Sequence, residues 1–258
     1  MPGPGPHMLY TLGIGTAIGS LSKGRFTPHH CLVYAVNAFL GPDIGSFSEW
    51  LTSTLGIAEG LGSQIMDIIH HPFYYILILG IPLSIFYSWV SKVALQKGLL
   101  SASSGVSLSR KQCALLISAG SLSHFFLDHL FEENGHSRTF TWIISTGWWE
   151  GRAPVNNEAV IVVGFLCICL LLGFTYINRV KPGKVMTQSN QSSKLIGIIA
   201  ILYCLWCASQ IYWRNPRQPA VGEEADLGVI IFMTIYFFLP HGLCIAAMDS
   251  TTSSELPL

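Results

Sequence analysis

Charged side chains are scarce in this sequence. Lys, Arg, Asp and Glu make up 11% of its 258 residues, whereas about a quarter of the residues of a soluble domain are charged. Half of the residues are hydrophobic, and the mean hydropathy is +0.49. This balance excludes an ordinary soluble globule and predicts a membrane protein. The 14 basic and 14 acidic residues balance each other, so no nucleic-acid partner is indicated.

The sequence also lacks the cysteine spacing typical of a disulfide framework and the features typical of a cleaved signal peptide. The seven cysteines all lie in or beside apolar runs, where small buried residues are common. Cys204 and Cys207 form the single C-x-x-C pair, which we interpret as helix packing because it lies inside an apolar segment. The first ten residues contain neither a basic cluster nor a small-residue cleavage site, so we expect no cleaved signal peptide.

Apolar runs with helical spacing make up most of the chain. They predict an all-α, polytopic helical membrane protein with about seven hydrophobic helices and one amphipathic segment at the membrane interface. Gly15 and Gly19 form a Gly-x-x-x-Gly face, where a second helix is expected to approach closely. The expected helices cover residues 8–21, 30–40, 73–90, 112–131, 159–177, 195–213 and 227–248, with the interfacial segment at 46–69 and a disordered tail at 249–258.

Basic residues are concentrated in alternate loops. If every hydrophobic helix crosses the membrane, the loops on one side contain no acidic residue and hold ten of the 14 basic residues: Lys23, Arg25, Lys92, Lys97, Arg110, Lys111, Arg179, Lys181, Lys184 and Lys194. The positive-inside rule makes these loops cytosolic. His29 and His30 fall on this side, and we expect them at the membrane interface, with His30 kept as an outside candidate ligand.

A His/Asp motif lies in the helix expected over residues 112–131. His124 and Asp128 are four positions apart and share one helix face, and Glu132 extends this row by one turn. Such a pair forms half of a divalent metal site, although a hydrogen-bonded structural pair has the same spacing. Further His and Asp residues fall at the extracytoplasmic or lumenal ends of other helices. We therefore predict metal ligands at His7, Asp43, His71, His124 and Asp128.

The order of these motifs resembles the LexA-binding, inner-membrane-associated, metal-dependent hydrolase family. The stretches that carry the resemblance are His7-Met-Leu-Tyr, Leu40-Gly-Pro-Asp-Ile44, His71 at a helix start and Ser123-His124-x3-Asp128. The set is also similar, more distantly, to zinc-dependent phospholipase C. The resemblance covers about residues 7–150. It departs from the family at Gly45, which replaces a second Asp, and at His70-His71, of which we favour His71 as the equivalent ligand.

The resemblance implies a membrane-embedded hydrolase that uses a metal-activated water on a lipid phosphoester or ester. Zinc suits the histidines, and manganese or iron fits a His/Asp mixture nearly as well. Asp43 or Glu132 would be the general base. Residues 1–150 would form the hydrolase region and residues 151–248 a three-helix membrane region. An ion or proton transporter and a non-catalytic membrane scaffold are the alternatives. The oligomeric state is not indicated.

Overall fold

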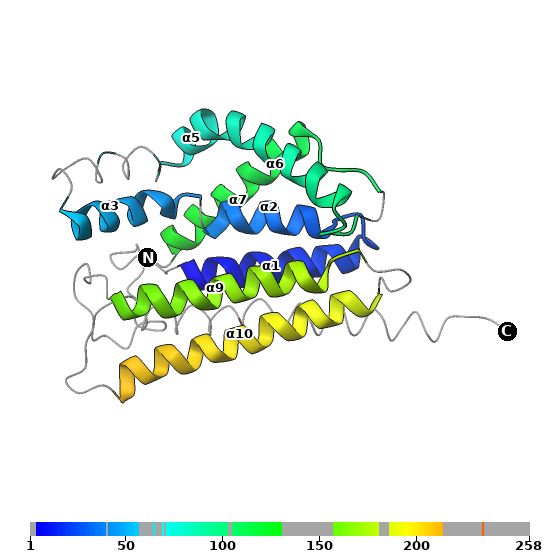
Figure 1. Cartoon of the computed structure of the whole chain (residues 1–258). Helices are drawn as coiled ribbons and strands as arrows, with labels where there is room; N and C mark the ends of the chain where they lie inside the picture. The colour runs from blue at the N-terminus through cyan, green and yellow to red at the C-terminus, as the bar shows by residue number, and fades with distance from the viewer. Residues whose placement is uncertain are drawn as a thin grey trace.

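The fold was taken from a computed structural model of the chain. The structure describes residues 4–39, 41–56, 71–102, 105–130, 157–180 and 186–213, together with positions 64, 69 and 234 (Figure 1). Within these ranges the regular elements are helices, which confirms the all-α prediction. They are α1 (Pro4–Leu21), α2 (Pro28–Phe39), α3 (Asp43–Leu55), α5 (Pro72–Tyr74), the π-helix η1 (Tyr75–Leu79), α6 (Gly80–Gln96), α7 (Arg110–Leu130), α9 (Asn157–Ile177) and α10 (Met186–Tyr212).

The longer helices form a bundle. In Figure 1, α1, α2, α6, α7, α9 and α10 run roughly along one common direction, and each runs opposite to the one before it. Helix α2 packs against both α1 and α7, α6 packs on α7, and α9 and α10 pack on each other and on α1. Helices α1 and α2 therefore lie between an α6–α7 pair and an α9–α10 pair.

The main hydrophobic core joins the N-terminal and C-terminal parts of the described chain. It contains Leu12 of α1, Ala35 of α2, Leu170 of α9 and Cys207 of α10, all of which are fully buried. The boundary predicted near residue 150 does not separate two hydrophobic cores in the described ranges, since α9 and α10 share this core with α1 and α2.

Small residues allow α1 and α2 to approach closely. A Cβ atom at Gly15 would lie 3.0 Å from the sulfur of Cys31, and one at Gly19 would lie 3.0 Å from the carbonyl oxygen of Phe26. The Gly-x-x-x-Gly prediction is therefore confirmed at Gly15, which lies against Cys31 of α2, whereas Gly19 lies against Phe26 in the connection between the two helices. Helix α1 begins earlier than expected, because prolines are tolerated in the first turn of a helix, where backbone N–H groups have no intrahelical partner. His7 consequently lies inside α1 instead of preceding it.

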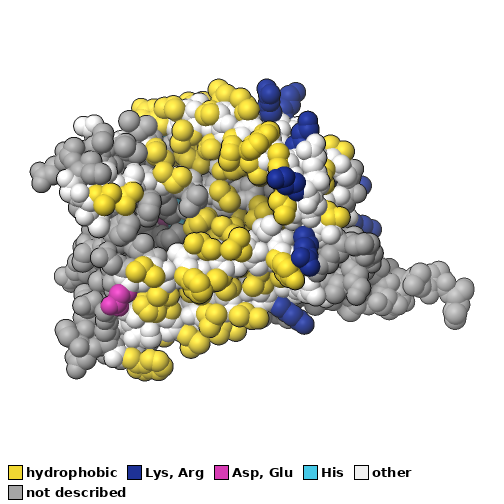
Figure 2. All heavy atoms as spheres, in the orientation of Figure 1, with side chains coloured by type: hydrophobic (Ala, Val, Ile, Leu, Met, Phe, Trp, Pro, Cys, Tyr) yellow, Lys and Arg dark blue, Asp and Glu magenta, His cyan; other side chains and the backbone are white. Residues whose placement is uncertain are grey.

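A wide apolar surface covers the face of the bundle seen in Figure 2. Two segments among the described residues are long and apolar enough to cross a membrane, Tyr75–Gln96 and Asn190–Gln210, and Ile161–Ile177 is a shorter apolar helix. Exposed large side chains follow one face of each, namely Leu77, Ile81, Ile85 and Trp89 on the first, Ile198, Ile201 and Leu205 on the second, and Ile161, Phe165, Ile168 and Leu172 on the third. Such faces are typical of contact with lipid.

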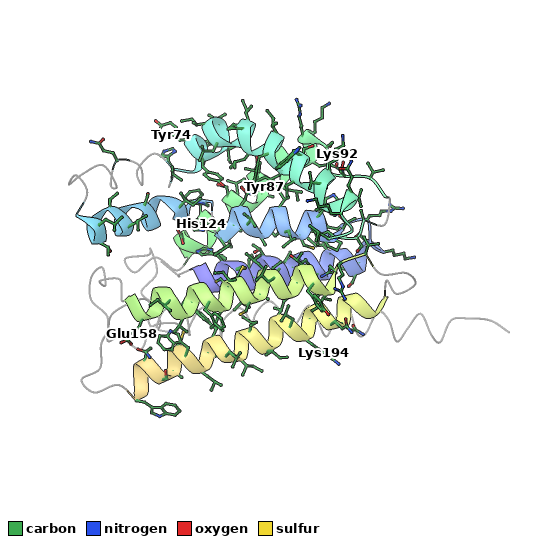
Figure 3. All side chains as sticks on the ribbon, in the orientation of Figure 1. Tyr74, Tyr87, Lys92, His124, Glu158 and Lys194 are labelled. Atoms are coloured by element: carbon green, nitrogen blue, oxygen red, sulfur yellow. The ribbon has the colours of Figure 1, made fainter. Side chains whose placement is uncertain are left out.

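The basic residues gather at one end of the bundle. Figure 2 shows Lys and Arg side chains at this end, and Figure 3 shows Lys92 and Lys194 there, with His124 and Glu158 toward the other end. This separation agrees with the charge pattern of the sequence.

The segment expected at the interface differs from the prediction. Helix α3 covers Asp43–Leu55 and ends at Gly56, whose φ of 64° suits glycine at a helix end. In Figure 1, α3 continues in the direction of α2 instead of crossing the end of the bundle. Most of residues 57–70 lie outside the described residues, as do the last expected helix, apart from position 234, and the tail at 249–258.

Candidate metal centre

Three predicted ligands meet at one point inside the bundle. His7 Nε2 lies 3.1 Å from Asp128 Oδ1, and His124 Nε2 lies 3.2 Å from Asp128 Oδ2. One ligand atom from each of the three residues lies within 4.8 Å of the others. The two imidazole rings stack with their centroids 4.1 Å apart. Figure 3 labels His124 on α7, beside the end of α2.

Helix geometry and a close helix contact create this cluster. His124 and Asp128 are one turn apart on α7, and His7 reaches them from the first turns of α1. Gly120, one turn before His124, lies against α2, where a Cβ atom would stand 2.6 Å from the carbonyl oxygen of Tyr34. The missing side chain at Gly120 brings the backbone of α7 against α2, so His124 reaches the end of that helix.

The hydrogen bond of the second ring nitrogen of His124 assigns its tautomer. His124 Nδ1 lies 2.9 Å from the carbonyl oxygen of Ala38, which can only accept a hydrogen bond. The proton is thus assigned to Nδ1, and Nε2 of the neutral ring carries a lone pair. A metal-bound histidine in proteins commonly makes this same outward N–H contact.

The electrostatics of the cluster favour a cation. In the neutral ring, the Nε2 lone pair of His124 faces a carboxylate oxygen 3.2 Å away, and two acceptors at this distance repel unless a proton or a metal ion lies between them. Two ligands of one tetrahedral zinc ion stand about 3.3 to 3.5 Å apart, given bond lengths near 2.0–2.1 Å. The two histidines contact different oxygens of Asp128, and one ligand atom from each residue lies within 4.8 Å of the others, so the side chains would rearrange around one ion.

Burial makes the cluster unusual for a structural pair. His7 and His124 are fully buried and Asp128 is 6% exposed. Nδ1 of His7 is buried and has no hydrogen-bond partner among the described residues. A buried imidazole nitrogen without a partner is costly, and an ion bound at Nε2 would leave this cost in place, because Nδ1 lies on the opposite side of the ring. Two imidazoles and one carboxylate fit a divalent metal with a fourth position left for water or substrate.

Of the remaining predicted site residues, only His71 has a described side chain, and it is not part of this cluster. His71 lies just before α5 and stacks on Tyr74 with ring centroids 4.3 Å apart, and its buried Nδ1 has no partner within the described structure. Asp43 is the first residue of α3, but its side chain lies outside the described part of the structure, as does the whole of Glu132. Those two assignments therefore stay predictions.

The two histidines expected at the membrane interface differ from each other. His29 is 3% exposed, so it packs inside the protein, and its position at the membrane interface stays a prediction. Its Nδ1 lies 3.0 Å from Ser91 Oγ, and its Nε2 lies 3.4 Å from the carbonyl oxygen of Leu100. His30 is half-buried, and its Nδ1 caps the backbone N–H of Thr27. Both lie at the basic end of the bundle, away from the cluster.

Sequence reasoning missed the groups that surround His124. Asn37 is fully buried in α2, and its side-chain amide donates to the carbonyl of Val33. The hydroxyl of Tyr75, in η1, donates to Asn37 Oδ1 at 2.8 Å. The amide side chain inside the apolar run at 30–40 could have indicated such a contact, because a buried polar group in an apolar helix needs hydrogen-bond partners.

Comparison with known proteins adds no assignment. No protein-family model, curated protein or solved structure matches this chain. Any account of its function therefore depends on the cluster and on the helices that hold it.

Proposed function

We propose that this chain is a multi-pass membrane hydrolase whose single divalent metal ion is held by His7, His124 and Asp128. The observation that carries the proposal is the convergence of three buried ligand atoms within 4.8 Å, one of them from a helix distant in sequence. The outward Nδ1–H of His124 supports it, because this contact orients Nε2 as a ligand atom. Zinc is the favoured ion, with manganese and iron as alternatives.

Each residue of the proposed site would have a separate role in hydrolysis. When bound, the metal would act as a Lewis acid that activates water and polarises the scissile group. His7 and His124 would fix its position, and Asp128 would balance its charge. Asp43 or Glu132, which follow α2 and α7 in the sequence near the same end of the bundle, would accept the proton from water as a general base.

A lipid phosphoester or carboxylic ester is the proposed substrate. The bundle that holds the cluster has apolar outer faces, so an amphiphile in the bilayer would be in direct contact with this protein. We place the basic end of the bundle in the cytosol and the cluster on the extracytoplasmic or lumenal side, since Lys and Arg concentrate in cytosolic loops. The resemblance to metal-dependent membrane hydrolases points to the same chemistry.

The first test is the metal content of detergent-purified protein. Wild type should contain close to one divalent ion per chain, and a His124→Ala, Asp128→Ala double variant should contain only a trace. His30→Ala is the matched control, because His30 lies at the opposite end of the bundle and should leave metal content unchanged. Equal trace amounts in wild type and double variant would exclude the metal centre.

The second test is hydrolysis in mixed micelles. Phosphoester and acyl-ester lipids should release product with wild type and with His30→Ala, but not with the double variant or after chelation. If the protein contains one metal ion per chain but hydrolyses neither lipid class, the metal site is retained and the hydrolase function is rejected. Metal-dependent ion flux into vesicles would then favour a transporter.

A further inference from the structure

Among the described residues, no backbone N–H donates to the carbonyl group of Ala38, and the sequence gives a reason. In an α-helix this carbonyl would accept from the N–H four residues later, which is position 42. That residue is Pro42, which has no N–H. Helix α2 ends at Phe39, and the N–H of Gly41 bonds to the carbonyl of Val36 at 3.1 Å, which leaves the Ala38 carbonyl to a side chain. His124 Nδ1 fills this position at 2.9 Å.

The end of α2 is also held firmly in place. Tyr75 donates to Asn37, the residue before Ala38, and Gly41 packs directly on the Tyr75 hydroxyl. The hydroxyl of Tyr34 lies 2.7 Å from Ser123 Oγ, which ties α2 to α7 beside His124. These contacts prevent the Ala38 carbonyl from turning away from the imidazole.

We propose that Pro42 is a positioning residue for the metal centre. Because it offers no N–H to the Ala38 carbonyl after the end of α2, it selects the Nδ1–H tautomer of His124 and so presents Nε2 to the metal. The inference rests on the metal centre proposed above. It gives the Gly-Pro-Asp turn a role that is independent of Asp43.

The substitution Pro42→Ala tests this role. It supplies an N–H that competes with His124 for the Ala38 carbonyl. Pro28→Ala is the matched control, because Pro28 occupies the first position of the same helix, where an N–H has no intrahelical carbonyl to meet. Nitrogen-15 NMR of histidine-labelled protein in micelles reads the tautomer, with the His124 signals identified by their absence in His124→Asn. Titration with Cd²⁺ enriched in cadmium-113 then shows, through spin coupling, which nitrogen binds.

Wild type and Pro28→Ala should carry the His124 proton on Nδ1 and couple cadmium to Nε2. Pro42→Ala should show a mixed tautomer and bind Cd²⁺ about 10- to 100-fold more weakly, the usual cost of losing an outer hydrogen bond to a ligand. An unchanged tautomer and affinity in folded Pro42→Ala would overturn the proposal. If that variant does not fold, cadmium coupling to Nδ1 in wild type overturns it and coupling to Nε2 supports it.

The failure of the metal centre would be seen separately. If wild type binds no Cd²⁺ but His124 still carries its proton on Nδ1, the hydrolase proposal fails and the action of Pro42 on the tautomer stands. If metal-free wild type carries the proton on Nε2 alone, the positioning role is rejected whatever the metal result.

Discussion

His7 Nε2 and Asp128 Oδ1 lie 3.1 Å apart, although 121 positions separate the two residues in the chain. Neither side chain is stable alone at this depth, because an uncompensated buried charge or polar group is costly. Their contact therefore couples the first helix to α7, and a cation bound in the cluster would stabilise that coupling.

Asp128→Asn should abolish metal binding while preserving the size of the side chain. The amide keeps a hydrogen-bonding oxygen but lacks the negative charge that offsets a divalent ion. Inductively coupled plasma mass spectrometry should show a fall from about one ion per chain to a trace. The control is Glu158→Gln, which removes an exposed carboxylate toward the same end of the bundle. Retention of metal by Asp128→Asn would remove the carboxylate from the ligand set.

Removing the metal should destabilise the fold. A ligand present at about 100 times its dissociation constant stabilises the native state by about 2.7 kcal/mol. Chelation should therefore lower the melting temperature of wild type, and returning zinc should restore it. His124→Ala should melt at the same temperature with and without chelator. If the chelator lowers the melting temperature of both proteins equally, its effect does not come from a metal ion bound at His124.

Gly120→Ala should weaken the contact between α2 and α7. The added methyl would stand 2.6 Å from the Tyr34 carbonyl oxygen and 2.9 Å from Asn37 Cβ, so the helices must separate. Overpacking of this kind costs about 1–3 kcal/mol. The control is Gly164→Ala in α9, where a Cβ meets nothing within 4 Å and alanine favours the helix by about 1 kcal/mol. Thermal unfolding should shift downward for the first variant and upward for the second.

The orientation of the chain can be tested by glycosylation. Asn190-Gln-Ser192 is an acceptor sequence at the basic end, and it should remain unmodified in microsomes if that end faces the cytosol, as proposed above. The substitution His136→Thr completes an Asn134-Gly-Thr acceptor in the loop after α7, where a glycan should be added. A glycan at Asn190 would reverse the proposed orientation.

Local spacing was sufficient to predict part of the candidate site. The pairing of His124 with Asp128 follows from one turn of helix, and the charge pattern placed His7 near them because basic loops mark the opposite end. The contribution of Asn37, Tyr75 and Gly120 could not be predicted, since it depends on how α6 and α7 rotate and slide against α2. The absence of His71 from the cluster has the same origin.

The helices of the fold were predicted from local patterns, whereas some of their ends were not. The apolar runs predicted the described helices of the bundle, because hydrophobic length and period are local properties. The start of α1 was placed too late, since Pro4 and Pro6 were taken as a preceding segment although helix first turns accept proline. The end of α3 at Gly56 was also missed, because the apolar spacing continues past that residue.

The distance between the basic end of the bundle and the His/Asp cluster has a consequence for how the protein would acquire its metal. If the basic loops lie in the cytosol, as proposed above, the ligands must cross the bilayer during insertion, before the helices that would hold the ion have packed together. The ion would then come from the metal pool of the extracytoplasmic or lumenal compartment. Metal occupancy would report on the supply in that compartment, and cytosolic metal chaperones would have no direct access to the site.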